Sequence, residues 1–272
     1  MTGSDGYAIV SPSGESWAGV GHRSLTTELC CSHTQVDVIE TPPGEPWALS
    51  AAVETVCVPL DAPGQVVADG SCLSVPRGGI VRFPAGVQAE LSAAGQEQSS
   101  GEECRESTGN RGPDRAASQG TPWLVVGARA EPEPTAAPVV VDPGAVAFAV
   151  PSTSDVAIAR LTAPLGCTGM KVNLRRLEPG QSVPYHTEGE QEELFVPLDG
   201  PGAVRLAGET RRVPRAGIVR VAPPTPRGVV NDGPEDRIWF MVGAPPTGGP
   251  DEWDPGAVIL DLEDDTGRSD EG

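Results

Sequence analysis

The second half of the chain alternates short apolar segments with turns. Residues 194–198 are apolar and are followed by a Gly-Pro-Gly turn at 200–202, and residues 203–207 alternate between apolar and polar side chains. Residues 217–222 are rich in β-branched side chains, and residues 237–242 include aromatic ones. Such segments favour β-strands, and no segment of helical period is long enough to suggest an α/β fold. The pattern therefore predicts an all-β sandwich or barrel.

The chain also repeats itself, which indicates a duplicated domain. Five short stretches of the first half recur in the same order in the second: 43–44 at 179–180, 58–61 at 196–199, 75–82 at 213–220, 126–128 at 242–244, and 142–146 at 254–258. We therefore predict two domains, residues 1–147 and 148–263. The first carries an insertion at 95–121 with almost no apolar residues, which we expect to be a mobile loop. Residues 264–272 are expected to be a disordered acidic tail.

The net charge of the chain argues against two kinds of partner. Asp and Glu number 38 against 19 Lys and Arg, which gives a formal net charge of −19, and Lys171 is the only lysine. Such a chain repels phosphate backbones and anionic membranes, so we expect no nucleic-acid or membrane partner. The excess of carboxylates is typical of a salt-rich cytoplasm, where self-repulsion is screened. With no signal peptide or apolar span in the sequence, we expect a cytoplasmic protein whose six cysteines are free thiols.

One motif in the second half contains residues that could bind a ligand or a metal ion. Gly180, His186, Glu193 and Gly200 follow the spacing G-x5-H-x-H-x4-E-x6-G, with Glu188 in place of the second histidine. This resembles the first motif of the cupin superfamily, and the weaker match at 217–231 resembles the second. The resemblance covers both halves through the repeat. It implies two tandem cupin (jelly-roll) barrels that pack against each other within the chain, and the acidic composition resembles that of proteins from halophilic archaea.

The resemblance also implies a metal site in the second barrel. Residues two apart on a strand share a face, so His186 and Glu188 would both project into the barrel, joined by Glu193. One histidine and two carboxylates would suit a single Mn²⁺ or Fe²⁺ ion. However, Arg227 stands where the family has its fourth ligand, and a guanidinium on these carboxylates could replace the ion. Both interpretations remain open on the sequence.

The first copy lacks this set. Its aligned stretch, 45–54, contains no histidine, and Ala89 stands at the position of the fourth ligand. We therefore predict that the first barrel binds no metal and has a structural role. In the second copy, Glu190 and Glu192 are interpreted as solvated charges.

Three hypotheses for function follow. The first is a bicupin that holds a small polar or sugar-like molecule in the second barrel, with Arg227 and Asn231 as contacts, or that is purely structural. The second is a metal-dependent oxygenase or isomerase that uses His186, Glu188 and Glu193. The third, a storage or scaffold role, suits a cytosolic acidic chain least. The sequence assigns no catalytic residue and no further oligomeric state, because fold alone does not choose a reaction.

Overall fold

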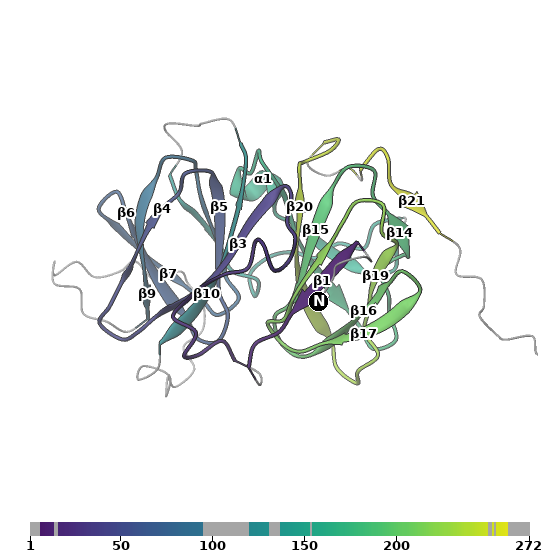
Figure 1. Cartoon of the computed structure of the whole chain (residues 1–272), viewed down its shortest axis with the longest axis horizontal. Coiled ribbons are helices and arrows are strands. Elements are labelled where there is room, and N and C mark those ends of the chain that lie inside the picture. Colours follow the sequence, from purple (N-terminus) through teal and green to yellow (C-terminus); the bar gives the residue numbers. More distant parts are fainter. Residues whose placement is uncertain are drawn as a thin grey trace, which may run out of the picture.

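The computed structural model describes residues 6–13, 16–94, 120–130, 137–152, 154–249, 252 and 254–260. These residues form four antiparallel sheets, arranged as two barrels side by side (Figure 1). The all-β fold predicted from the sequence is confirmed, with one short helix, α1 (Thr162–Leu165), near the junction. The insertion at 95–121, apart from its last two residues, and the tail at 264–272 lie outside the described residues.

Each barrel consists of a larger and a smaller sheet. In the first barrel the larger sheet has the order β11 (Val139–Val141), β8 (Ile80–Phe83), β5 (Glu54–Pro59), β10 (Thr121–Ala128), β3 (Thr34–Thr41), β2 (His22–Ser24). The smaller sheet has the order β4 (Trp47–Ser50), β9 (Gln88–Ala93), β6 (Gly64–Ala68), β7 (Ser71–Val75).

The second barrel repeats this plan. Its larger sheet has the order β1 (Tyr7–Val10), β18 (Ile218–Val221), β15 (Glu192–Pro197), β20 (Arg237–Ala244), β13 (Lys171–Leu177), β12 (Ala157–Arg160). Its smaller sheet has the order β17 (Glu209–Val213), β16 (Gly202–Leu206), β19 (Arg227–Val230), β14 (His186–Thr187), β21 (Val258–Ile259). Strand β1, at the start of the chain, therefore belongs in space to the second barrel, and Figure 1 shows it in purple across the green strands.

Side-chain alternation along the central strands separates two kinds of core. On β13, Val172 and Leu174 point into an apolar core that the two barrels share, and on β3 Val36 and Val38 do the same. Residues that alternate with these face the inside of their own barrel, as Ile39, next to Val38, does in the first. The larger sheets therefore pack face to face, and each barrel keeps an interior of its own.

Two loops cross the junction between the barrels. The main-chain N–H groups of residues 168 and 169 each donate to Glu54 at 2.9 Å. In the opposite direction, the N–H groups of residues 32 and 34 donate to Glu192 at 2.8 and 3.2 Å. Glu192 is fully buried, so its interpretation as a solvated charge is wrong, whereas Glu190 is exposed as expected. A helix long and apolar enough to span a lipid bilayer does not occur in the described part of the chain.

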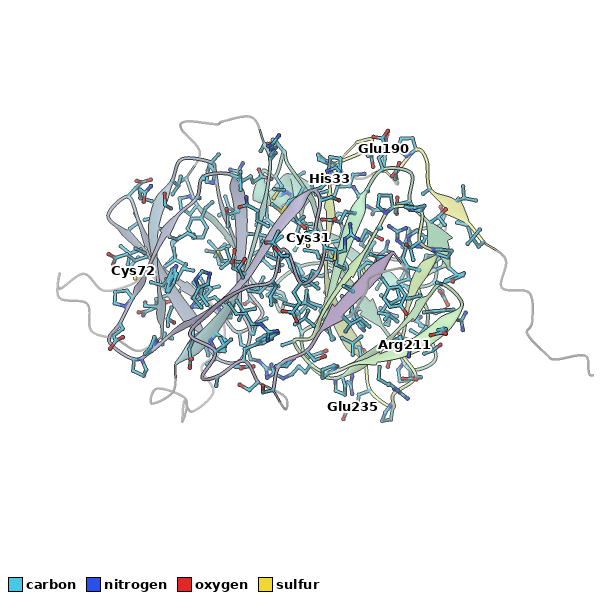
Figure 2. All side chains as sticks on the ribbon, in the orientation of Figure 1. Cys31, His33, Cys72, Glu190, Arg211 and Glu235 are labelled. Atoms are coloured by element: carbon cyan, nitrogen blue, oxygen red, sulfur yellow. The ribbon has the colours of Figure 1, made fainter. Side chains whose placement is uncertain are left out.

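Five of the six cysteines are among the described residues, and Cys104 lies outside them. Cys31 and Cys167, equivalent in the repeat, both pack against the shared core, and Cys31 lies at the junction between the barrels (Figure 2). Cys30, Cys31, Cys57 and Cys167 are free, as expected. The expectation is wrong for Cys72, which is disulfide-bonded and lies in the barrel-one half of Figure 2.

Candidate ligand site in the second barrel

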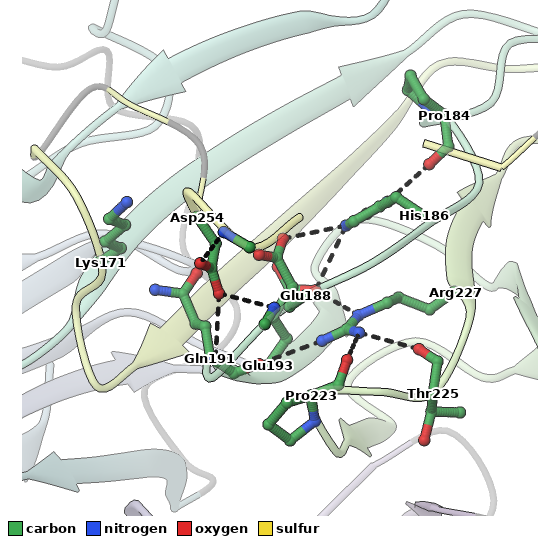
Figure 3. Close-up of polar contacts among 12 residues, drawn as sticks. Lys171, Pro184, His186, Glu188, Gln191, Glu193, Pro223, Thr225, Arg227 and Asp254 are labelled. Atoms are coloured by element: carbon green, nitrogen blue, oxygen red, sulfur yellow. Dashed lines mark hydrogen bonds and ion pairs between the residues drawn. The ribbon is translucent and has the colours of Figure 1, made fainter. Parts of the chain in front are cut away.

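The residues predicted from the motif come together inside the second barrel. His186 on β14 and Glu188, which follows that strand, are both buried, and Glu193 projects from β15 of the facing sheet. The Nε2 atom of His186 lies 3.2 Å from Glu188 Oε1 and 3.8 Å from Glu193 Oε2 (Figure 3). One donor atom from each of the three lies within 4.8 Å of the other two. The set is therefore compact enough to bind one cation.

The tautomer of His186 is fixed by a main-chain carbonyl. Its Nδ1 lies 2.7 Å from the oxygen of Pro184, which can only accept a hydrogen bond, so Nδ1 carries a proton. Nε2 faces Glu188 and Glu193. It carries a second proton if the imidazole is charged, and a lone pair if the imidazole is neutral. Burial alone lowers the pKa of His186, but the two carboxylates outweigh it and raise that pKa. Burial raises the pKa of Glu188, against the opposing effect of His186. The site therefore favours a positive charge at Nε2, supplied by a proton or a metal ion.

Arg227 is fully buried beside these groups. Its position on β19 is the cross-strand partner of His186, and its Nε donates to Glu193 Oε2 at 2.9 Å. The other guanidinium nitrogens donate to main-chain carbonyls: Nη1 to Pro223 and to Thr225, Nη2 to Gln191. The guanidinium thus neutralises one carboxylate of the set, and each of its three nitrogens donates to the protein, which leaves it little capacity to contact a ligand.

The sequence predicts that Asn231 contacts the ligand, but in the structure its side chain bonds to the main chain of the protein. Its Nδ2 donates to the carbonyls of Leu177 and Glu235, and its Oδ1 accepts the N–H of Gly233. It is 1 % exposed and does not line the cavity beside His186. The side chain holds the turn before β20, which the motif match could not distinguish from a pocket position.

The cavity is lined by more polar groups than the motif indicates. Its volume is about 60 Å³. Of the predicted residues, His186, Glu188 and Glu193 border it, together with the following residues from neighbouring strands and loops: Arg160, Lys171, Asn173, Arg175, Gln191, Glu252 and Asp254. These were missed because they lie outside the motif. The signal was present in β13, where Lys171, Asn173 and Arg175 alternate with apolar residues and so share one face.

A single carboxylate, that of Asp254, fixes the loop between Glu188 and Glu193. Oδ2 of Asp254 accepts the main-chain N–H groups of residues 189, 190 and 191, at 3.0, 3.1 and 3.3 Å (Figure 3). Burial alone would raise the pKa of Asp254, but these N–H groups and that of Gly256 outweigh it, so the pKa lies below its usual range. Asp254 therefore positions both carboxylates of the set without contacting either.

Comparison with known proteins identifies the fold. No family model matches the chain, and no curated protein matches it in sequence. Solved structures do match. Protein Ylba from E. coli has a TM-score of 0.64 at 13 % identity and covers 92 % of this chain and 95 % of its own. A cupin 2 conserved barrel domain protein from Leptotrichia buccalis has a TM-score of 0.56 at 10 % identity, over 82 % and 88 %. The oxalate decarboxylase of Lactobacillus farciminis, in complex with formate, has a TM-score of 0.58 at 13 % identity, over 88 % and 83 %.

These likenesses define the fold of the chain. The chain has the cupin fold, with two barrels in tandem, as the motif and the internal repeat predicted.

Proposed function

We propose that this chain binds a small polar molecule inside its second barrel, and that its first barrel is the structural partner of the second. The proposal rests on a difference between the interiors of the two barrels. The interior of the first barrel is filled by an apolar cluster that includes Ile39, Val125 and Trp123. The corresponding interior of the second barrel keeps a cavity with a polar end. Polar groups buried without need for the fold indicate a ligand.

Two of the oxygen atoms that border this cavity have no hydrogen-bond donor among the described residues. Oδ1 of Asn173 and Oε2 of Glu188 are buried and accept no hydrogen bond from any described residue. A buried acceptor without a partner costs about 1–3 kcal/mol. A ligand that donates hydrogen bonds to these oxygens would recover that cost, which supports a polar rather than an apolar ligand.

The test is a binding screen with a matched pair of variants. Small sugars, polyols, amides and carboxylic acids are added to the protein, and a ligand of the folded state raises the melting temperature by mass action. Asn173→Leu should abolish the shift. Asp37→Leu, at the equivalent place in the first barrel, should leave it unchanged. If no compound raises the melting temperature of the wild type, the proposal fails.

A metal-dependent enzyme is the second candidate, favoured by the convergence of His186, Glu188 and Glu193. One imidazole nitrogen and two carboxylate oxygens fit a Mn²⁺ or Fe²⁺ ion. Such an ion would act as a Lewis acid that polarises an oxygen atom of the bound molecule. The oxalate decarboxylase among the similar structures is an enzyme on this fold. Arg227 argues against this candidate. Its guanidinium already forms an ion pair with Glu193, so the site should have a lower affinity for a metal cation.

Elemental mass spectrometry separates the two candidates. The protein is purified without chelator, supplied with Mn²⁺ or Fe²⁺, and freed of unbound ions. A metal enzyme should retain about one ion per chain and lose it in His186→Ala, but not in His33→Ala, whose side chain is exposed. A metal-free wild type that still binds a small molecule contradicts the second candidate alone.

A further inference from the structure

Arg175 is a buried cation, and two of its three guanidinium nitrogens donate no hydrogen bond to the described residues. It lies in the middle of β13, its side chain borders the cavity, and it is 9 % exposed. Its Nε and Nη1 atoms are buried and have no hydrogen-bond partner among the described residues. This differs from Arg227, whose guanidinium donates to one carboxylate and three carbonyls.

The fold does not require an arginine at this place. Arg175 lies opposite Trp239 on β20, and in the first barrel Ile39 lies opposite Trp123 on β10 in the same register. Ile39 is buried in an apolar cluster. An isoleucine therefore satisfies the same backbone position, whereas burial of a guanidinium without a full set of hydrogen bonds is unfavourable. A partner for the guanidinium that is not part of the protein would offset this cost.

Charged side chains of both signs border the cavity. Arg160 on β12 lies opposite Asn173 of β13, so Arg160 and Arg175 border the same part of the cavity. The carboxylates of Glu188 and Glu193 lie toward His186. Burial lowers the pKa of Arg175 to about 10, with Arg160 lowering it and Glu193 raising it, so Arg175 remains charged at neutral pH. The two arginines attract an anion, and the carboxylates of Glu188 and Glu193 can accept hydrogen bonds from it.

On the basis of the proposed function, we infer that Arg175 binds the carboxylate of a small organic acid that also carries a hydroxyl or amino donor. A carboxylate matches the planar fork of a guanidinium. The donor of the acid would reach the unpaired oxygens of Asn173 or Glu188. A cavity of about 60 Å³ favours a small acid. Inorganic phosphate suits the site less, because its second charge would add to the repulsion by the carboxylates of Glu188 and Glu193, which border the same cavity.

Calorimetry with a pair of probes tests the charge requirement. Glycolate should bind, and glycolamide, its neutral counterpart of the same shape, should not. Arg175→Gln and Arg175→Ile should each weaken glycolate binding about tenfold or more, the effect of losing one charge-assisted hydrogen bond. Arg176→Gln is the matched control, since Arg176 is exposed on the opposite face of β13, and should bind glycolate as the wild type does.

The wild-type protein gives a second measurement, which does not depend on variants that fold. In ¹⁵N-edited NMR spectra, the Nε–H signal of Arg175, assigned with Arg175→Lys, should move on addition of glycolate and remain unmoved with glycolamide. Equal binding of both probes, unchanged binding by the Arg175 variants, or a signal that moves with phosphate or chloride but not with glycolate would each overturn the carboxylate inference. In those cases, a sugar or polyol that binds in the screen would still sustain the proposed function.

Discussion

Glu54 of the first barrel and Glu192 of the second occupy equivalent places and hold the two barrels together. Both carboxylates are fully buried. Each is paired with an arginine of its own barrel, Glu54 with Arg82 at 2.8 Å and Glu192 with Arg220 at 2.7 Å. Each also accepts main-chain N–H groups from a loop of the opposite barrel. The junction is therefore a reciprocal pair of clamps, one from each copy of the duplicated domain.

Breaking one clamp should destabilise the whole chain. In Glu192→Gln the charge of Arg220 stays buried without its counter-charge, and loss of one member of a buried pair costs about 3–5 kcal/mol. We expect a lower urea midpoint of unfolding for this variant. Glu190→Gln, at an exposed position two residues away, should change the free energy of unfolding by less than about 0.5 kcal/mol. Equal midpoints for the two variants would show that the clamp contributes nothing.

A close contact between a glycine and an indole ring should make Gly202 intolerant of a side chain. A Cβ at Gly202 would lie 2.2 Å from Cζ2 of the buried Trp239, and the first barrel repeats this contact between Gly64 and Trp123 at 2.0 Å. Gly202→Ala should cost about 1–3 kcal/mol through overpacking. If the contact is the cause, Trp239→Phe should lower the cost in a double-mutant cycle measured by chemical unfolding. Strictly additive effects would point to another cause.

The position of Asp254 predicts a change in stability with pH. Its pKa is lower in the folded chain than the unfolded value of about 3.9, so its ionised form stabilises the fold above that pH. This stabilisation is lost as the pH falls through the lower, folded pKa. The difference in unfolding free energy between wild type and Asp254→Asn should therefore be largest above pH 5 and shrink toward pH 2. Urea unfolding at a series of pH values measures it, with the exposed Asp236→Asn as control.

Thiol reactivity should follow burial. Burial raises the pKa of Cys31 to about 11 and raises those of Cys57 and Cys167 further. Since the thiolate is the nucleophile, these three should react slowly with iodoacetamide at neutral pH, while the exposed Cys30 should react first. Mass spectrometry of peptides after timed labelling gives the order. Labelling of Cys57 as fast as Cys30 in the folded protein would contradict the buried position.

The net charge of −19 predicts that salt stabilises the chain. Repulsion among exposed carboxylates opposes the compact state, and at about 1 M salt the Debye length falls to about 3 Å. We expect the melting temperature to rise from dilute buffer to molar KCl. A melting temperature independent of KCl would argue against adaptation to a salt-rich environment.

Much of the fold could be predicted because it depends on local patterns. Strands separated by Gly and Pro turns, and five repeated stretches, indicated two β-barrels, and the spacing of His186, Glu188 and Glu193 placed them on a common interior. The interpretation of Glu192 was wrong because its burial depends on residues 32–34, which lie some 160 positions away. Asn231 matched a motif position, but its neighbours in space turned its amide toward the main chain.

The class of fold, the duplication and the three residues that could hold a cation follow from the order of residues along the chain, because alternation and spacing are properties of neighbouring residues. The contacts of each charged side chain depend instead on long-range packing. In the folded chain all three guanidinium nitrogens of Arg227 have protein partners, whereas two nitrogens of Arg175 have none among the described residues. Both are arginines on strands of the same barrel, and the difference arises from the long-range packing that sets which groups are brought together and removed from water.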